Sequence, residues 1–207
     1  MQVGIFQKKY SERIDNDYRT LIGNIIKITG SIQNKIIAVS SLYPNEGKTT
    51  TITNLALFLA RDGFKTLLID ADLRMPSLQR LFETKTKFGL YDFCTGICSD
   101  NECIVRDIVS NLDIITAGNH KTITDEMLSL NFQTNRINSI KSDYDFILID
   151  MPPIKLYKDI VCFKKIIQGI IFVSKKEMQV CSDEITNCLE WLKIENIEVI
   201  GYVINSV

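Results

Sequence analysis

Runs of large apolar and β-branched residues recur along the chain, separated by segments with helical periodicity. Few polar residues interrupt these runs, which is typical of strands that are buried on both faces of a sheet. The alternation of strand and helix predicts an α/β fold with a mostly parallel central sheet and helices on both faces, a three-layer sandwich. The expected strands lie at 35–41, 65–70, 112–116, 145–150, 168–173 and 197–204.

Apolar residues at helical spacing predict helices between these strands. One helix is expected around 13–28, one from Lys48 to a glycine stop at Gly63, one over 122–142, and a last one that ends near Leu192. Residues 1–34 are therefore expected to form a polar N-terminal segment with one helix. Residues 35–207 are expected to form the main domain.

Three of the strand-like runs lead directly into acidic or phosphate-binding stretches. Carboxyl ends of parallel strands meet at one edge of a sheet, and ligands bind there. The three stretches together predict a site for a magnesium–nucleotide complex. They are Pro44-Asn45-Glu46-Gly47-Lys48-Thr49 after the first run, Asp70-Ala71-Asp72-Leu73-Arg74 after the second, and Asp150-Met151-Pro152-Pro153 after the fourth.

The first stretch has most of a P-loop, in which backbone N–H groups at a helix start surround phosphate oxygens. The usual pattern is G-x4-G-K-[ST], and Leu42 occupies the first glycine position. Asn45 offsets this in part, because asparagine tolerates left-handed backbone angles. Taken alone, the loop is equally compatible with a helix that merely starts with Gly-Lys. The residues expected to hold the nucleotide here are Asn45, Glu46, Gly47, Lys48, Thr49 and Thr50.

The other two stretches supply carboxylates. Asp150 is placed to hold magnesium through water. Strand alternation could direct Asp70 and Asp72 together toward the γ-phosphate, where two like charges are costly unless a cation shares them. Arg74 has three possible tasks: neutralising these carboxylates, clamping the following loop, or forming a plain structural salt bridge.

Charge, hydropathy and cysteine content limit the possible binding partners and the cellular compartment. The net charge of −1 comes from 24 Lys and Arg against 25 Asp and Glu, which gives no electrostatic case for nucleic acid. No apolar run approaches about 18 residues, so we expect a cytoplasmic protein without its own membrane span. The cysteines at 94, 98 and 103 match no common zinc spacing, and the chain has one histidine. We expect the cysteines to be reduced and to act as small hydrophobes.

The combined motifs resemble the bacterial tyrosine kinases of capsule and exopolysaccharide synthesis, which are P-loop proteins. The resemblance spans about Asp17 to Asn205. It rests on an apolar triplet with D-x-D-x-R over 67–74, an apolar triplet with D-x-P-P over 147–153, and the loop over 44–49 with Asn45 in place of a glycine. It implies transfer of the ATP γ-phosphoryl group to a tyrosine hydroxyl, with ATP and Mg²⁺ as cofactors.

The resemblance also implies a role for each site residue. Lys48 would hold the phosphates, and Asp70 would orient the acceptor hydroxyl and take its proton late. Asn205 would contact adenine, with a helix or turn cap as the alternative. The catalytic set is then Lys48, Asp70 and Asp72, and the magnesium ligands are Thr49, Asp72 and Asp150.

Two features depart from the family pattern. An E-x2-R-x2-R helix that builds a ring in the family falls here on Asn16, Arg19 and Ile22, so only Arg19 matches. Family chains also carry a tyrosine-rich tail, and the resemblance leaves open whether one follows Val207. The seven tyrosines of this chain are instead scattered, at positions 10, 18, 43, 91, 144, 157 and 202.

Two other functions remain open. One is a nucleotide-switch ATPase that places division sites or partitions chromosomes, a class that carries a second lysine where this chain has Tyr43. The other is an ATP-bound regulatory module that docks on a membrane polysaccharide co-polymerase. For the kinase, the resemblance implies a protein-tyrosine substrate and a transmembrane activator, which would recruit the protein to the inner face of the plasma membrane.

Overall fold

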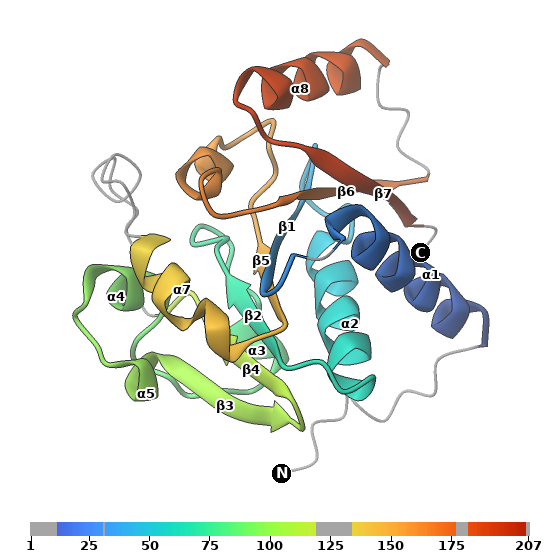
Figure 1. The fold of residues 1–207 in the computed structure, drawn as a ribbon. Coiled ribbons are helices and arrows are strands. Elements are labelled where there is room, and N and C mark those ends of the chain that lie inside the picture. Colours follow the sequence, from blue (N-terminus) through green and yellow to red (C-terminus); the bar gives the residue numbers. More distant parts are fainter. Residues whose placement is uncertain (1–11, 31, 119–133, 177–181, 206–207) are drawn as a thin grey trace.

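The computed structural model describes residues 12–30, 32–118, 134–176 and 182–205 (Figure 1). Its centre is a seven-stranded sheet with the strand order β3-β4-β2-β5-β1-β6-β7. The strands are β1 (Lys35–Ser41), β2 (Thr66–Asp70), β3 (Ile104–Val109), β4 (Leu112–Ile115), β5 (Phe146–Asp150), β6 (Gly169–Lys175) and β7 (Val199–Asn205).

The prediction of a mostly parallel sheet is confirmed, and all six expected strands are present. Strand β3, which was not predicted from the sequence, pairs antiparallel with β4 at the edge of the sheet. This strand lacks a continuous apolar run, because Arg106 and Asp107 stand exposed in its middle. Asp107 also has a positive φ of 52°, and the register shifts between Val105 and Val109. An irregular, half-exposed edge strand does not produce the periodicity that identifies buried strands.

Helices cover both faces of the sheet, as predicted (Figure 1). Helices α1 (Glu12–Thr29), α2 (Lys48–Arg61) and α3 (Leu78–Leu81) bury apolar residues in the cluster on one face. Helices α4 (Leu90–Thr95), α7 (Thr134–Ile140) and α8 (Ser182–Ile194) do so on the other. The remaining short elements are α5 (Asp100–Cys103) and the 3-10 helices η1 (Lys141–Asp143) and η2 (Asp159–Phe163).

Strand β1 shows how one apolar run serves both layers. Ile36 and Ala38 belong to the cluster beneath α4 and α7, whereas Ile37 and Val39 belong to the cluster beneath α2. All four side chains are at most 1% exposed. Alternate residues of a strand point to opposite faces, so a strand at the centre of a three-layer sandwich must be apolar throughout.

The expected helices around 13–28 and after Lys48 are confirmed as α1 and α2. The helix expected over 122–142 is described only from Thr134 to Ile140, since residues 119–133 lie outside the described part of the chain. Helix α8 is described from Ser182 onward. Within the described ranges, no helix combines the length and the apolar character needed to cross a bilayer.

One expectation about the cysteines was wrong. Cys98 and Cys103 form a disulfide across the link between α4 and α5, where the Cα atoms are 6.3 Å apart. Gly96 ends α4 with a φ of 77°, and the resulting turn brings the two cysteines together. Cys94 and Cys188 are free and buried, as expected of small hydrophobes.

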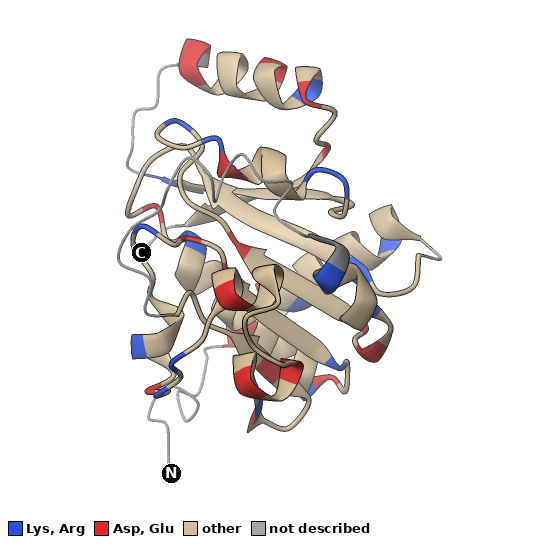
Figure 2. Cartoon of the chain, turned by 90° about the vertical axis from the view of Figure 1, so that its left-hand side faces the viewer, with Lys and Arg blue, Asp and Glu red and all other residues tan. Residues whose placement is uncertain are grey.

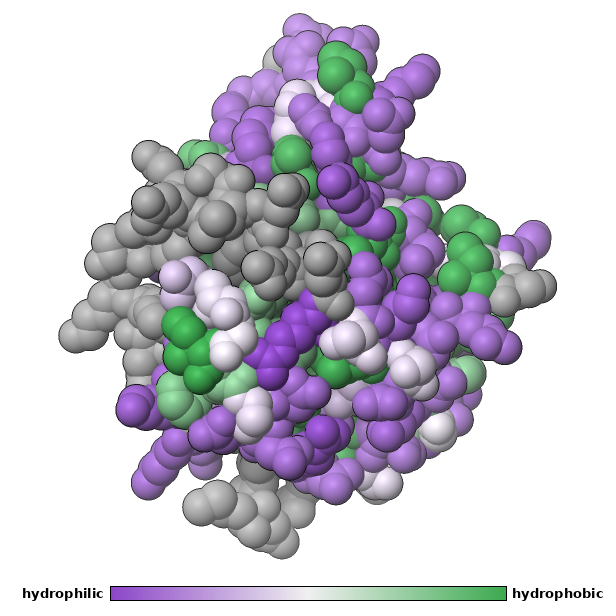
Figure 3. Space-filling model, turned by 60° about the vertical axis from the view of Figure 1, so that its left-hand side comes forward, coloured by the Kyte–Doolittle hydropathy of each residue, from purple (hydrophilic) through white to green (hydrophobic). Residues whose placement is uncertain are grey.

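Charged residues of both signs are interspersed around the molecule (Figure 2). On the face drawn in Figure 3, apolar side chains appear as small separate patches between polar ones. In the cartoon of Figure 2, blue and red residues alternate along the described part of the chain, and no region is of one charge sign alone. This distribution agrees with the nearly balanced charge of the sequence.

Candidate nucleotide and phosphoryl-transfer site

The three stretches singled out in the sequence end neighbouring strands of the sheet. Strands β2, β5 and β1 lie side by side in that order. Asp150 is the register partner of Asp70 on one side and of Val39 on the other. The predicted convergence at the carboxyl edge of the sheet is therefore confirmed.

The loop between β1 and α2 has the backbone form that the sequence predicted. Asn45 adopts a left-handed conformation with a φ of 62°, and Gly47 has a φ of 90°. A Cβ atom at Gly47 would lie 2.0 Å from the Asn205 side-chain nitrogen, so the glycine is needed for close approach. Asn205, the last residue of β7, donates a hydrogen bond to the Glu46 carbonyl oxygen at 3.2 Å.

Glu46 braces the loop from inside. Its side chain is fully buried, and Oε2 accepts the backbone N–H of Tyr43 at 2.8 Å. The second oxygen, Oε1, is buried without a hydrogen-bond partner among the described residues. Glu46 thus supports the loop, whereas Thr50 is exposed on the cleft side of α2.

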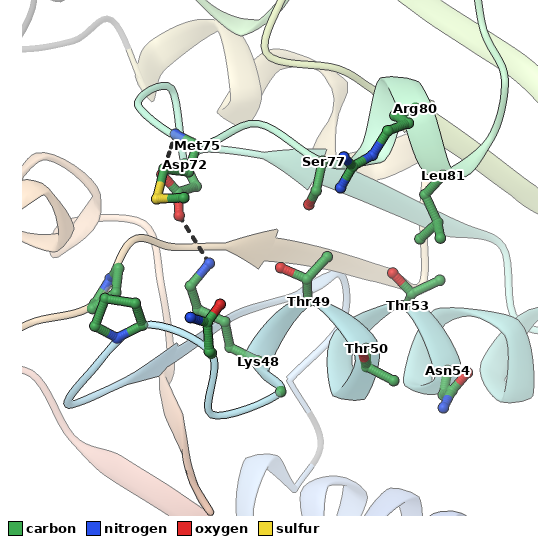
Figure 4. Close-up of a pocket in the computed structure, with 14 residues that line it drawn as sticks. Lys48, Thr49, Thr50, Thr53, Asn54, Asp72, Met75, Ser77, Arg80 and Leu81 are labelled. Carbon is green, nitrogen blue, oxygen red and sulfur yellow. Dashed lines mark hydrogen bonds and ion pairs between the residues drawn. The ribbon is translucent and has the colours of Figure 1, made fainter. Parts of the chain in front are cut away.

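The charged centre of the site joins all three strand ends. Lys48 Nζ lies 2.8 Å from Asp72 Oδ2 and 3.8 Å from Asp150 Oδ1. Thr49 Oγ1 donates a hydrogen bond to Asp150 Oδ2 at 2.6 Å. Figure 4 shows Lys48 reaching from the start of α2 to Asp72. The lysine and the three residues predicted to hold magnesium are thus brought together.

Asp70 has contacts that the sequence did not predict. Its side chain is fully buried, and Oδ1 accepts the N–H of Asp72 at 3.2 Å. Oδ2 accepts the N–H groups of Ser77 and Leu78, each at 3.0 Å. Because β2 ends at Asp70, strand alternation does not extend to Asp72, and only Asp72 lines the cleft. Asp70 instead holds the following segment and the start of α3 in place.

Arg74 forms a structural salt bridge, one of the three tasks left open, and this bridge also holds the loop that follows β2. Its guanidinium forms an ion pair with Asp159 in η2 and lies 4.1 Å above the Tyr157 ring. These contacts tie the segment after β2 to the segment after β5. Arg74 therefore fixes the two loops that flank the carboxylates.

Burial and mutual repulsion perturb the carboxylates. Burial, with the charge of Asp150 adding to it, raises the pKa of Asp70 to about 7. Burial also raises the pKa of Asp150 to about 6, although Lys48 opposes the rise. Burial would lower the pKa of Lys48, but the charges of Asp150 and Asp72 outweigh it and raise that pKa. The site thus holds more negative charge than its one lysine neutralises.

This surplus fits a divalent cation. Asp150 Oδ1 is buried and accepts no hydrogen bond in the described structure. In the same ranges, no three His, Cys, Asp or Glu side chains form a metal cage of their own. Mg²⁺ rarely needs such a cage, because it is commonly bound through one or two carboxylates, waters and substrate phosphates. The donor set of Thr49, Asp72 and Asp150 suits that mode of binding.

A cleft of about 500 Å³ opens beside these residues, a volume in the range of small-molecule sites. It extends beyond the P-loop between α2 and the segment 75–81 (Figure 4). Thr53 and Arg80, which line this outer part together with Ser77, were not predicted from the sequence. Thr53 could have been found, because it stands one helical turn after Thr49 on the same face of α2.

The fold and the site define a P-loop nucleotide-binding protein. A family model described as an AAA domain matches residues 34–187. The chain is 32% identical over 202 residues to the tyrosine-protein kinase CpsD of Streptococcus agalactiae serotype III, an alignment that covers 97% of this chain and 84% of that protein. The protein therefore belongs to the bacterial tyrosine-protein kinase family.

Solved structures agree with this assignment. The chimerical protein CapA2B2 is 25% identical with a TM-score of 0.86, covering 98% of this chain and 88% of that one. The septum site-determining protein MinD of Pyrococcus horikoshii, complexed with Mg-ADP, is 26% identical with a TM-score of 0.68, covering 83% and 70%. CapA2B2 and the septum site-determining protein MinD thus share this fold.

Proposed function

We propose that this protein transfers the γ-phosphoryl group of ATP to the hydroxyl of a protein tyrosine. The observation that carries the proposal is the meeting of Lys48, Thr49, Asp72 and Asp150 at one end of an open cleft. Phosphoryl transfer depends mainly on positioning and electrostatic stabilisation, which such a cluster supplies. The open remainder of the cleft leaves room for an acceptor side chain.

The P-loop and Lys48 bind the phosphates in this proposal. Backbone N–H groups over 45–50 surround the β-phosphate, as at other helix N-termini. Lys48 exchanges its contact with Asp72 for phosphate oxygens, so one charge-assisted hydrogen bond replaces another. Asn205 lies against Gly47 and borders the nucleotide from the side of β7.

Thr49, Asp72 and Asp150 hold magnesium in this proposal. When bound, Mg²⁺ neutralises charge that develops on the phosphate oxygens and orients them. The Thr49 hydroxyl, which now donates to Asp150, becomes available as a ligand. A bound cation would also offset the burial and the repulsion by Asp72 that raise the pKa of the Asp150 carboxyl.

Asp70 acts on the acceptor side in this proposal. A loose transition state needs little early deprotonation of the phenol, whose usual pKa is about 10. To take this proton late, the buried Asp70 carboxylate, which does not line the cleft, would have to exchange one of its three backbone N–H donors for the phenol. Its hydrogen bonds to Ser77 and Leu78 also position one wall of the cleft.

A nucleotide-switch ATPase is the second candidate, because the MinD structure has the same fold. Tyr43 weighs against it, since it stands where that class carries its second lysine. In this chain, the Tyr43 hydroxyl is engaged by Lys155 and Glu184 within the same molecule. The proposed setting is capsule or exopolysaccharide synthesis, with a transmembrane activator that recruits the protein to the inner face of the plasma membrane.

Incubation with γ-labelled ATP and Mg²⁺, alone and with tyrosine-containing peptides, tests the proposal. Label on tyrosine would support the kinase. Release of free phosphate without labelled tyrosine would favour the switch ATPase. ATP binding with neither product would favour a regulatory module and would overturn the kinase proposal.

A further inference from the structure

The outer part of the cleft is distinct from the phosphate site. Thr49 at the inner end touches Asp150, whereas Thr53 stands one turn, or about 6 Å, further along α2. Opposite Thr53, the wall is formed by Ser77 and Arg80. Figure 4 shows the Arg80 side chain extending from α3 toward Ser77 and over the cleft. This part therefore lies beyond the residues that the triphosphate requires.

Two groups in the outer cleft differ from the paired charges of the inner site. Thr53 is 2% exposed, and its hydroxyl has no hydrogen-bond partner in the described part of the chain. Arg80 is exposed, and within the described ranges its guanidinium has no ion pair. By contrast, the nearby Arg74 is paired with Asp159. A buried hydroxyl without a partner is costly, and an unpaired cation over a cleft attracts anions.

Apolar side chains complete this end of the cleft. Met75 is 68% exposed and lies next to Asp72, whereas Leu81 lies at the other end of the wall, near Thr53 (Figure 4). A flexible thioether suits the flat apolar faces of a phenol ring. The combination of an apolar wall, a free hydroxyl and an unpaired guanidinium is suited to a tyrosine with a carboxylate close by in its chain.

We propose that this outer cleft, formed by Thr53, Met75, Ser77, Arg80 and Leu81, selects acceptor segments in which acidic residues flank the tyrosine. Arg80 binds the flanking carboxylate, and the Thr53 hydroxyl bonds to a polar group of the bound segment. The ring of the acceptor packs on Met75, with its hydroxyl directed to the inner site, and Leu81 contacts a neighbouring residue of the bound segment. This inference rests on the proposed tyrosine-kinase function and assigns the substrate class of that site.

Matched peptides test the selection. Each carries one central tyrosine, flanked by glutamate, glutamine or lysine in otherwise identical sequences. The full chain is compared with Arg80→Gln and Arg80→Glu, and Arg13→Gln serves as an exposed-arginine control on α1. Phosphotyrosine formation gives kcat/KM for each pair, and the KM for ATP is measured in parallel.

We expect the wild-type protein to prefer the glutamate peptide by about fivefold, the range of a partly exposed ion pair. Arg80→Gln should lose this preference, and Arg80→Glu should favour the lysine peptide, with the KM for ATP within about twofold of wild type. A reversal of preference cannot come from a merely structural arginine. Unchanged selectivity in Arg80→Gln, or a loss confined to ATP binding, would overturn the inference.

Binding without transfer separates this inference from the kinase proposal. Fluorescence anisotropy of labelled peptides, with Mg²⁺ and a non-hydrolysable ATP analogue, measures affinity when no phosphotyrosine forms. Tighter binding of the glutamate peptide that depends on Arg80 supports the cleft assignment even if transfer fails. Equal binding of all three peptides contradicts it. Thr53→Val should weaken glutamate-peptide binding without lowering thermal stability, because the hydroxyl it removes has no partner.

Discussion

The carboxyl edge of the sheet and helix α1 both carry residues that the family resemblance singles out, but these residues have different contacts. At the strand ends, Lys48 contacts Asp72 and Asp150, which come from two other strand ends. On α1, Arg19 lies 2.8 Å from Asp15 and 3.6 Å from Asp62. Lys48 and Asp72 line the cleft, whereas Arg19 forms its ion pairs with residues of the same chain.

The other two positions of the ring motif, Asn16 and Ile22, also make their described contacts within the chain. Asn16 is exposed, and its carbonyl oxygen accepts a hydrogen bond from Thr20 within the helix. Ile22 is 6% exposed and packs in the core beneath α1 and α2. Helix α1 is thus fastened to its own domain, also by Tyr18 stacked on Phe58 at 4.8 Å. The proposed catalytic residues therefore lie at strand ends of this chain, whereas the described contacts of Arg19 and Ile22 on α1 are contacts within the chain.

The largest effect should come from Lys48→Met. We expect phosphotyrosine formation to fall at least about 100-fold, because the phosphates lose a positioned charge. The fold should persist, since the neighbouring carboxylates can take up protons in place of the missing cation. The exposed Lys85→Met is the matched control and should retain activity. Full activity of Lys48→Met would place the phosphate site elsewhere.

Asp70→Asn should have the next largest effect. We expect turnover to fall about 100-fold while ATP affinity changes little, because the charge near the acceptor is lost. The amide also cannot accept all three backbone N–H bonds that Asp70 now receives. Steady-state kinetics and ATP titration measure the two quantities, with the exposed Asp143→Asn as control. Equal losses in both would make Asp70 a metal ligand instead.

A smaller effect concerns pH. The raised pKa values of Asp70 and Asp150 mean that the nucleotide-free folded state binds more protons than the unfolded state between about pH 4 and 7. The stability that these groups contribute is therefore present at low pH and lost as pH rises through their folded pKa values. Denaturant unfolding should give a higher midpoint at pH 5 than at pH 7.5. Asp150→Asn should reduce the difference between the two midpoints. If the variant keeps the wild-type pH dependence of stability, the raised carboxylate pKa values do not cause it.

The smallest effect is expected on α1. Arg19→Ala should leave kinase activity unchanged and shift the melting temperature by less than about 2 °C, because exposed ion pairs contribute little. Activity assays and analytical ultracentrifugation measure the outcome. A large loss of activity together with a change in oligomeric state would show that α1 forms an intermolecular contact that activity requires.

Sequence patterns predicted the strand ends well because buried strands and P-loops depend on local residue types. Asn45 in a left-handed conformation and the meeting of Lys48 with Asp72 and Asp150 were both predictable in this way. The backbone contacts of Asp70 were not predictable, because they depend on how the segment after β2 folds back. The Cys98–Cys103 pair likewise depends on a turn at Gly96 that spacing alone does not define.

The most direct test of the account is a single-turnover experiment that follows the γ-phosphate. Enzyme in excess over γ-labelled ATP is mixed with an acidic tyrosine peptide or with its phenylalanine counterpart, and the label on peptide and in free phosphate is counted. We predict that most label reaches the tyrosine peptide and none reaches the phenylalanine peptide. Equal release of free phosphate with both peptides, and no labelled peptide, would contradict phosphoryl transfer to tyrosine.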